Sequence, residues 1–314
     1  GRAGRTEPGI AIRLWHQGQT ASLPAFSPPE ILEADLSGLV LDAAAWGVTD
    51  PATLSLLDKP PLPALKEAKA LLSRLGALDD AGRLTADGEA MRSLALPARL
   101  AHMVAEAGKR GEALRAAELA MLLTERGLGG NETDLDTRMS RFRNDRSDRA
   151  QRAKGLAKRL AANVPNKGEA AGSSVGRMLI DAYPDRIAKA RGATGQFLLA
   201  NGRGGEVDPA ISLSRAQWLV VADMSGKAGR ARVLSAAEVS ETEIRTALGN
   251  KFESGRQVVY DVEKNALRAR EAVRIGAIAL SENPLAAPSG VSADEGVIAA
   301  VREHGLQILP WGKE

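Results

Sequence analysis

The chain has 314 residues, of which 44% are hydrophobic, 26% charged and only 3% aromatic. This composition excludes a disordered chain and predicts two or three folded domains with a core of Ala, Leu, Val and Ile. The formal net charge of +3 permits nucleic-acid binding without requiring it, and the absence of cysteine excludes a disulfide framework. No apolar run approaches the roughly 20 residues that span a bilayer, and the three histidines lack metal-ligand spacing. We therefore expect a cytoplasmic protein with no membrane partner and no metal site.

The first nine residues contain two arginines, Arg2 and Arg5, each beside a glycine. Two forked guanidinium groups on a slim backbone suit one anionic group such as a phosphate. Taken alone, these residues fit a flexible Gly/Arg-rich tail equally well. The alternating run Ile10–Trp15 predicts a short edge strand directly afterwards, which favours an ordered element over a tail.

Residues 23–95 predict helices followed by a β-hairpin, an arrangement typical of a winged-helix module. A first helix is expected from Pro28, capped by Ser27, and a second from Leu62 to Leu75, ending at Gly76. Residues 77–85 predict a strand, a turn and a strand, and residues 86–94 a short helix. Winged helices often contact DNA, but the second helix is only weakly basic, which favours a structural role.

Residues 96–190 predict an all-helical bundle whose most charged part is a single helix over about 135–160. Between residues 138 and 159, seven arginines and two lysines are opposed by only two acids. A solvated face is the common fate of such a run, but the preference for arginine favours contact with phosphates. An apolar seam is expected at Met139, Phe142, Ala153, Leu156 and Leu160. The candidates for nucleic-acid contact in this helix are Arg138, Arg141, Arg149 and Arg152.

Residues 191–285 contain short β-like runs separated by turns, which predict a small OB-like β-barrel of five strands with one interposed helix, Ser240–Leu248. The strands are expected at 196–200, 218–222, 230–234, 257–262 and 267–278. OB barrels commonly hold single strands by charge and stacking, and the scarcity of aromatics here favours phosphate contact. The candidates for this contact are Arg203, Arg268 and Arg270. Residues 286–314 predict a C-terminal helix, opened by a capping box at Ser292 and Glu295, and a truncated tail.

Several motifs, taken in order, resemble the DEAH-box ATP-dependent helicases of superfamily 2. The segment Gly1–Gly9 with the following Leu14-Trp15 resembles helicase motif VI, although the Gln and Arg that open this motif in the family are missing. The resemblance covers essentially the whole chain, and its last motifs fit one bacterial branch of the family. The further segments that carry it are Trp46–Val48, Leu75–Asp79, Gly82–Thr85, Pro97–Met103, Ala182–Ala188, Leu198–Gly204 and Leu306–Trp311.

The resemblance implies an α+β, mainly helical fold in which residues 1–22 form the trailing edge of a second RecA-like domain and residues 96–190 a ratchet-like bundle. It implies that Arg2 and Arg5 are catalytic, and that Gly1, Arg2, Gly4 and Arg5 lie on the γ-phosphate side of ATP. The partners it implies are single-stranded nucleic acid, RNA or DNA, and the missing RecA-like domains of the same parent chain.

ATP and Mg²⁺ are expected to bind the full-length parent and not this chain alone. Hydrolysis needs a phosphate cradle, a lysine, a metal-binding carboxylate and a base, and the chain has no Gly-x-x-x-x-Gly-Lys-Ser/Thr sequence. The Asp294-Glu295 pair opens a predicted helix, whereas a DExH element belongs at the end of a strand. We therefore expect this chain alone to be inactive as an ATPase.

Two other functions remain open from the residues. One is a non-enzymatic nucleic-acid-binding module with winged-helix and OB-like parts, in which the two N-terminal arginines form a phosphate-binding arm. The other is a protein-interaction scaffold whose charges only confer solubility.

Overall fold

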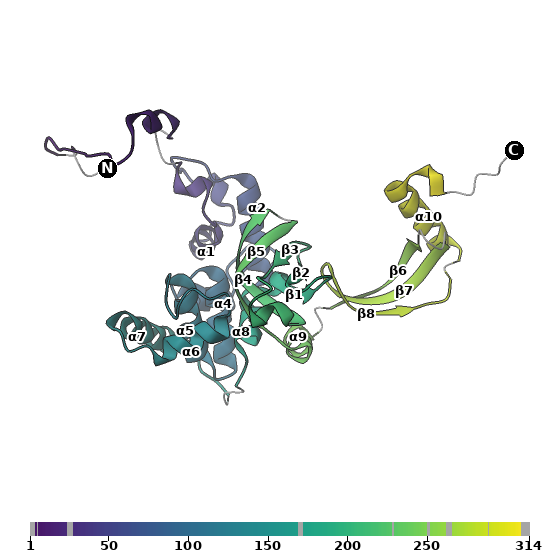
Figure 1. The fold of residues 1–314 in the computed structure, drawn as a ribbon. Helices are drawn as coiled ribbons and strands as arrows, with labels where there is room; N and C mark the ends of the chain where they lie inside the picture. Colours follow the sequence, from purple (N-terminus) through teal and green to yellow (C-terminus); the bar gives the residue numbers. More distant parts are fainter. Residues whose placement is uncertain are drawn as a thin grey trace. The chain divides into compact units, whose positions relative to one another are not determined.

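The structure is a computed structural model, which describes residues 4, 6–23, 28–168, 172–227, 229–249, 252–261, 266–287 and 289–308 (Figure 1). The chain divides into two compact units, Gly1–Thr85 and Ala86–Glu314. Helices dominate up to residue 182 and strands dominate from residue 187, which gives an α+β fold. No helix among the described residues combines the length and the apolar character needed to cross a membrane.

The first unit contains two α-helices, α1 (Ser37–Ala45) and α2 (Leu62–Arg74). The first helix begins later than predicted, at Ser37, with Leu36 as an N-cap residue that makes no side-chain cap. The carboxylate of Asp35 accepts hydrogen bonds from the backbone N–H and the hydroxyl of Ser37. Residues 30–32 form only a 3-10 turn, and the predicted cap Ser27 lies outside the described residues. The second helix agrees with the prediction, and Gly76 follows it with a φ of +71°.

The predicted hairpin of the first unit is present as a minimal pair. Leu78 and Leu84 form an antiparallel bridge, and the backbone N–H of Thr85 donates to the carbonyl of Ala77 over 3.0 Å. The predicted strand Ile10–Trp15 pairs with no described strand, and its apolar side chains are exposed.

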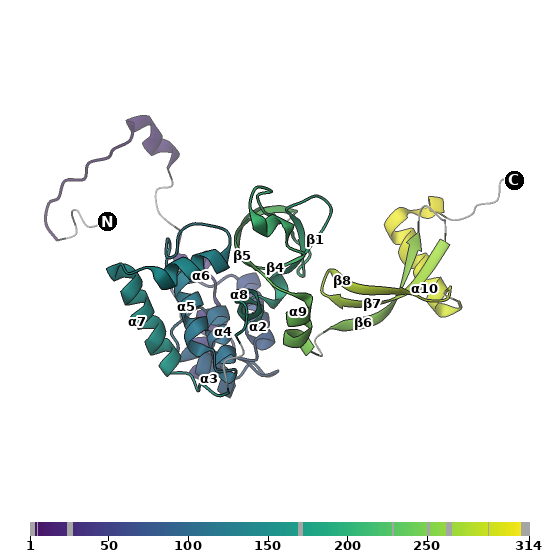
Figure 2. The same cartoon turned by 60° about the horizontal axis from the view of Figure 1, so that its bottom comes forward.

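The second unit begins with a helical bundle whose core is built largely from alanine. Helix α5 packs against α4 and α7, and α4 packs against α8 (Figure 2). Small side chains such as Ala101, Ala107, Ala116 and Ala120 are fully buried, which allows the helices to approach closely. The helices are α3 (Ala86–Arg92), α4 (Ala98–Lys109), α5 (Ala113–Thr124), α6 (Leu135–Asn144), α7 (Asp148–Ala162) and α8 (Val175–Ala182).

The charged helix predicted over about 135–160 is two helices, α6 and α7, so the prediction of one helix was wrong. Asp145 has an extended backbone, and its carboxylate accepts from the N–H of Ser147 over 2.8 Å. The hydroxyl of Ser147 then accepts from the N–H of Ala150 and caps α7. Asp and Ser compete with the helix for backbone hydrogen bonds in this way, and so the chain turns between the two helices.

A closed five-stranded barrel follows the bundle, in the order β1-β2-β3-β5-β4. Strands β3 and β5 pair in parallel and all other neighbours pair antiparallel. The interior is filled by Phe197, Leu199, Leu219, Val221 and Val233. The strands are β1 (Ile187–Ala190), β2 (Gln196–Leu199), β3 (Gly204–Glu206), β4 (Trp218–Lys227) and β5 (Arg230–Glu238).

The composition of the predicted barrel was partly wrong. The strands expected at 257–262 and 267–278 belong to a separate antiparallel sheet, β6-β7-β8, while β1 and β3 complete the barrel. Helix α9 (Glu241–Leu248) has the expected bounds and the capping box of Ser240 and Glu243, but it follows the barrel. The separate sheet consists of β6 (Glu253–Asp261), β7 (Ala266–Ile275) and β8 (Ile278–Pro284).

Helix α10 (Val291–His304) packs on β6 and β7 of this separate sheet. Gly296 makes the approach possible, since a Cβ at this position would lie 2.5 Å from the side chain of Val258. The helix begins at Val291 after Gly290, so the capping box expected at Ser292 is absent, because Ser292 is already inside the helix.

The bundle and the barrel are joined through β5. The backbone N–H of Ala236 donates to the carbonyl of Thr133 over 2.9 Å, and Asp134 forms a parallel bridge with Ala236. Gly176 of α8 faces the end of β5, where a Cβ would lie 2.1 Å from the carbonyl oxygen of Glu238. The segment before α6 therefore extends the barrel sheet, and α8 lies directly against it.

Candidate nucleic-acid interface

The face of α7 that points away from the core carries a row of arginines. Ala150, Ala153, Ala157 and Leu160 are buried and form the inner face. Arg149, Arg152 and Arg159 recur at the i, i+3, i+10 spacing of another face and are exposed. Helical periodicity therefore separates the arginines from the apolar residues.

Two adjoining hollows lie beside α7, and a third hollow adjoins the second of them. The first hollow has a volume of about 970 Å³ and the second about 460 Å³, and both are lined by Glu125 and Leu156. The third hollow has a volume of about 670 Å³ and shares the lining residues Pro97, Thr124 and Arg126 with the second. We call the two hollows beside α7 the arginine groove; the arginines that line it are Arg126, Arg149, Arg152 and Arg159. The third hollow continues it to the barrel, where its lining includes Tyr183, Ala222, Leu234 and Ser235.

The cations of the groove differ in how far the protein already neutralises them. Arg149 donates to the backbone carbonyl of Arg126 and lies 3.6 Å from a carboxylate oxygen of Glu125. Arg152 and Arg159 form no ion pair with any residue that the structure describes. The groove contains four arginines against two acids, Glu125 and Asp148, so it keeps an excess of positive charge. Such a surface attracts a polyanion.

Arg138 does not line the arginine groove, although it is among the residues that line the third hollow. Its assignment as a nucleic-acid contact stays a prediction. Only 8% of the residue is exposed. Its guanidinium donates to the hydroxyl of Ser235 over 3.1 Å and to the carbonyls of Leu122 and Leu128 over 3.1 and 3.4 Å. Burial is the largest influence on its pKa and lowers it. Arg138 thus ties α6 to α5 and to strand β5 through its two terminal nitrogens, whereas its Nε is buried without a hydrogen-bond partner among the described residues.

The other sequence candidates lie outside the groove. The side chain of Arg141 is 56% exposed and forms an ion pair with Glu132. The pKa of Glu132 is lowered, mostly by a hydrogen bond from its own backbone N–H and to a lesser extent by Arg141. Arg203 donates to the carbonyl of Gly226 over 3.3 Å and so links the β2–β3 and β4–β5 hairpins. The structure therefore brings together only Arg149 and Arg152 of the seven.

Two candidates, Arg268 and Arg270, lie on β7 of the separate sheet. Arg268 pairs with Asp261 over 2.9 Å, and Arg270 is half-buried. In the register of β6 and β7, Glu253 also stands opposite Arg274. Acidic residues of β6 therefore balance charge on the sheet face that was expected to be basic.

Two groove residues, Arg126 and Arg159, were missed as candidates. Arg159 was part of the basic run, and its seven-residue spacing from Arg152 would have placed it on the same helical face. Arg126 follows α5 and precedes the positive-φ glycines Gly127, Gly129 and Gly130, a position that predicts an exposed turn. A further hollow, of about 450 Å³ on the barrel, has Arg191 and Arg230 in its lining, but Arg230 pairs with Glu206.

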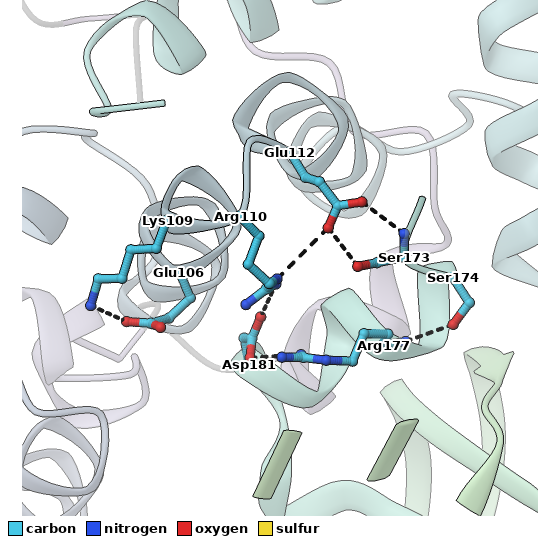
Figure 3. A network of polar contacts seen from close by, with 8 residues as sticks. All are labelled: Glu106, Lys109, Arg110, Glu112, Ser173, Ser174, Arg177 and Asp181. Atoms are coloured by element: carbon cyan, nitrogen blue, oxygen red, sulfur yellow. Dashed lines mark hydrogen bonds and ion pairs between the residues drawn. The ribbon is translucent and has the colours of Figure 1, made fainter. Parts of the chain in front are cut away.

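A polar network joins the corner between α4 and α5 to helix α8 (Figure 3). Glu112, which is 4% exposed, accepts hydrogen bonds from the N–H and hydroxyl of Ser173. Arg110 forms an ion pair with Glu112 and donates a hydrogen bond to the carboxylate of Asp181 on α8 over 2.6 Å. Arg177 donates to the carboxylate of Asp181 as well, over 2.9 Å. Burial is the largest influence on the pKa of Glu112 and raises it, but Ser173 and the nearby arginines outweigh burial and lower it. The α4–α5 corner is thereby fixed to α8.

The motif VI candidates Gly1, Arg2 and Arg5 lie outside the described residues. Gly4 is exposed in a turn with a φ of +80°, and a Cβ added at this position would meet no described atom within 4 Å. Their assignment to the γ-phosphate side of ATP stays a prediction.

No family model matches the chain. The chain is 39% identical over 316 residues to the ATP-dependent RNA helicase HrpB of Escherichia coli (strain K12). This alignment covers 100% of this chain and 38% of HrpB. The chain is 36% identical over 116 residues to the ATP-dependent RNA helicase HrpA of the same organism, which covers 35% of this chain and 9% of that relative. The chain thus spans about two fifths of the length of HrpB.

A solved structure agrees with these relatives. The crystal structure of the Escherichia coli DEAH/RHA helicase HrpB matches with a TM-score of 0.77 and 36% identity, over 99% of this chain and 38% of that one. Sequence and structure therefore agree over the whole length of the chain. The chain belongs to the HrpB-like DEAH helicases and corresponds to their C-terminal region.

Proposed function

We propose that this chain is the accessory region of an ATP-dependent nucleic-acid helicase, and that it holds one strand of the nucleic acid by its phosphates along the arginine groove. The observation that carries the proposal concerns Arg152 and Arg159, which lie on one face of α7. Neither arginine has an ion-pair partner among the described residues, and both line the hollow of about 970 Å³. Guanidinium groups without a protein partner are suited to phosphate oxygens.

The remaining modules would support this role. We interpret the first unit as a winged helix that braces the motor, the helical bundle as ratchet-like, and the closed barrel as OB-like. The strand order β1-β2-β3-β5-β4 supports the last interpretation. The third hollow, which continues the arginine groove to β4 and β5, would let a strand pass from the bundle to the barrel.

The full-length protein would hydrolyse ATP with Mg²⁺, and Arg2 and Arg5 would stabilise the charge on the transferred phosphoryl group. The described residues do not fit a nucleotide site of their own: Asp294 and Glu295 lie within α10, away from any strand end. ATP and Mg²⁺ would therefore be bound by other domains of the parent chain. The similarity to helicases over the whole chain disfavours the non-enzymatic alternative.

The proposal is tested by the salt dependence of binding. The fluorescence anisotropy of a labelled 12-nucleotide oligouridylate would be titrated with the chain at several salt concentrations. About five neutralised phosphates on a single strand give a slope of log K against log salt near −3.5, which is the expected result. Absent or salt-insensitive binding would contradict the proposal and favour an interaction scaffold.

A further inference from the structure

One apolar residue, Leu156, lies among the arginines of α7. It was expected in the apolar seam, but it is 37% exposed, whereas Ala153, Ala157 and Leu160 form the buried face. Leu156 follows Arg152 by four residues and precedes Arg159 by three, so all three share one face of the helix. It also lines both hollows of the arginine groove.

The wall of the smaller hollow on the α3–α4 side is apolar as well. It consists of the turn Leu94–Pro97, in which Leu94 is buried, Leu96 is half-buried, and Ala95 and Pro97 are exposed. Ala95 has a φ of +50°, a left-handed conformation that costs free energy for a residue with a Cβ. The deeper lining comes from Met121 and Leu160. Binding of a polyanion through its charges alone would not explain why apolar walls lie beside the arginines.

The smaller hollow combines apolar and charged lining residues. Its lining is mostly aliphatic, with Thr124, Glu125 and Arg126 as the polar members. Through the shared Leu156 it adjoins the larger hollow, which Arg152 and Arg159 line. A single-stranded nucleic acid has the matching pattern, with a charged backbone and flat bases of low polarity on their faces. In a duplex the base faces are stacked and unavailable to such a site.

We propose that the hollow between Leu156 and the turn Leu94–Pro97 accepts a nucleobase of the strand whose phosphates contact Arg152 and Arg159. This inference rests on the proposed function and adds that the groove selects unpaired, base-bearing strands. The lining of the hollow has no aromatic side chain, so the contact is aliphatic and tolerant of base identity.

The test compares two labelled 12-nucleotide strands, an oligouridylate and the same sugar-phosphate backbone with abasic residues at every position. The protein variant is Leu156→Ala. The matched control is Leu114→Ala, because Leu114 is a similarly exposed leucine, at 42%, on the bundle helix α5 and lines neither hollow of the groove.

We expect Leu156→Ala to weaken oligouridylate binding about three- to fivefold, because part of an apolar contact is lost, without changing the salt slope. Binding of the abasic strand is expected to be weaker than that of oligouridylate in the natural chain and unaffected by the substitution. Leu114→Ala is expected to bind both strands like the natural chain.

Equal affinity of the natural chain for both strands, or equal weakening of both by Leu156→Ala, would overturn this inference and leave the proposed function standing. No salt-dependent binding of either strand by the natural chain would overturn the proposed function itself. The two failures are thereby distinguished.

Discussion

Arg138 and Arg141 lie three residues apart on α6, yet their guanidinium groups meet different surroundings. Arg141 is exposed and forms a surface ion pair with Glu132, of the kind that contributes about 0–1 kcal/mol. Arg138 is buried and supplies donors to three oxygens from three different segments. Position on the helix thus decides whether an arginine stabilises the fold or remains available to a ligand.

Replacing Arg138 by Ala is expected to destabilise the chain by about 3 kcal/mol, because the Ser235 hydroxyl and two carbonyls lose a buried charged donor. Arg143→Ala is the control, since Arg143 on the same helix is 41% exposed. The measurement is the urea midpoint of unfolding. A variant with the natural midpoint and a reduced salt slope of strand binding would show that Arg138 contacts the strand after all.

At the scale of elements, helix α8 is positioned by charge as well as by packing. Its Asp181 receives hydrogen bonds from Arg110 and Arg177, and Glu112 holds the Ser173 residue that precedes the helix (Figure 3). The carboxylate of Glu112 has a lowered pKa in the folded chain. A lowered pKa means that folding favours the ionised form, so the stabilisation is present above the ordinary carboxyl pKa and is lost as the pH falls through the folded value.

Glu112→Gln is therefore expected to lower the melting temperature at pH 7, with a smaller difference from the natural chain as the pH falls from about 5 to about 3. Glu241→Gln is the control, since Glu241 forms an exposed i,i+4 pair with Arg245 on α9. Melting curves across this pH range give the measurement. A difference that stays constant with pH would mean that the charge of Glu112 contributes nothing.

Most helices could be predicted from the sequence because their signals are local. The end of α2 followed from the terminal glycine Gly76, and α9 was recognised as the helix Ser240–Leu248 among strand-like runs. The break between α6 and α7 was missed although Asp145 and Ser147 supply its hydrogen bonds, because a strong charge pattern continued across it. Leu156 was misplaced for another reason: it lies at helical spacing from Ala153 and Leu160 within α7, yet it sits at the edge of the buried face and is exposed.

At the scale of the whole molecule, strand pairing was the least predictable feature. The runs that form β6 and β7 were recognised, but which strands pair depends on contacts between distant residues. Strand β1 has four residues and β3 has three, two of them glycine, so neither shows an alternating pattern long enough to recognise. The family itself was recognisable, because its motifs depend on residue identity and not on pairing.

The arginine groove also depends on the tertiary packing of the bundle, because its residues come from separate segments of the chain. Its lining comes from the α3–α4 turn, the end of α5 and helix α7, which the bundle brings together. The sequence therefore identified Arg149 and Arg152, while the part played by Arg126 and by the turn Leu94–Pro97 emerged only from the packing of the helices.

The central claim, that the arginine groove holds the phosphates, is tested most directly by the double variant Arg152→Ala/Arg159→Ala. Its salt-dependent binding of oligouridylate would be measured beside that of Arg245→Ala, an exposed arginine of α9 outside the groove. Loss of two phosphate contacts is expected to flatten the slope of log K against log salt by about 1.4, whereas Arg245→Ala keeps the natural slope. A double variant with the natural affinity and slope would contradict the account.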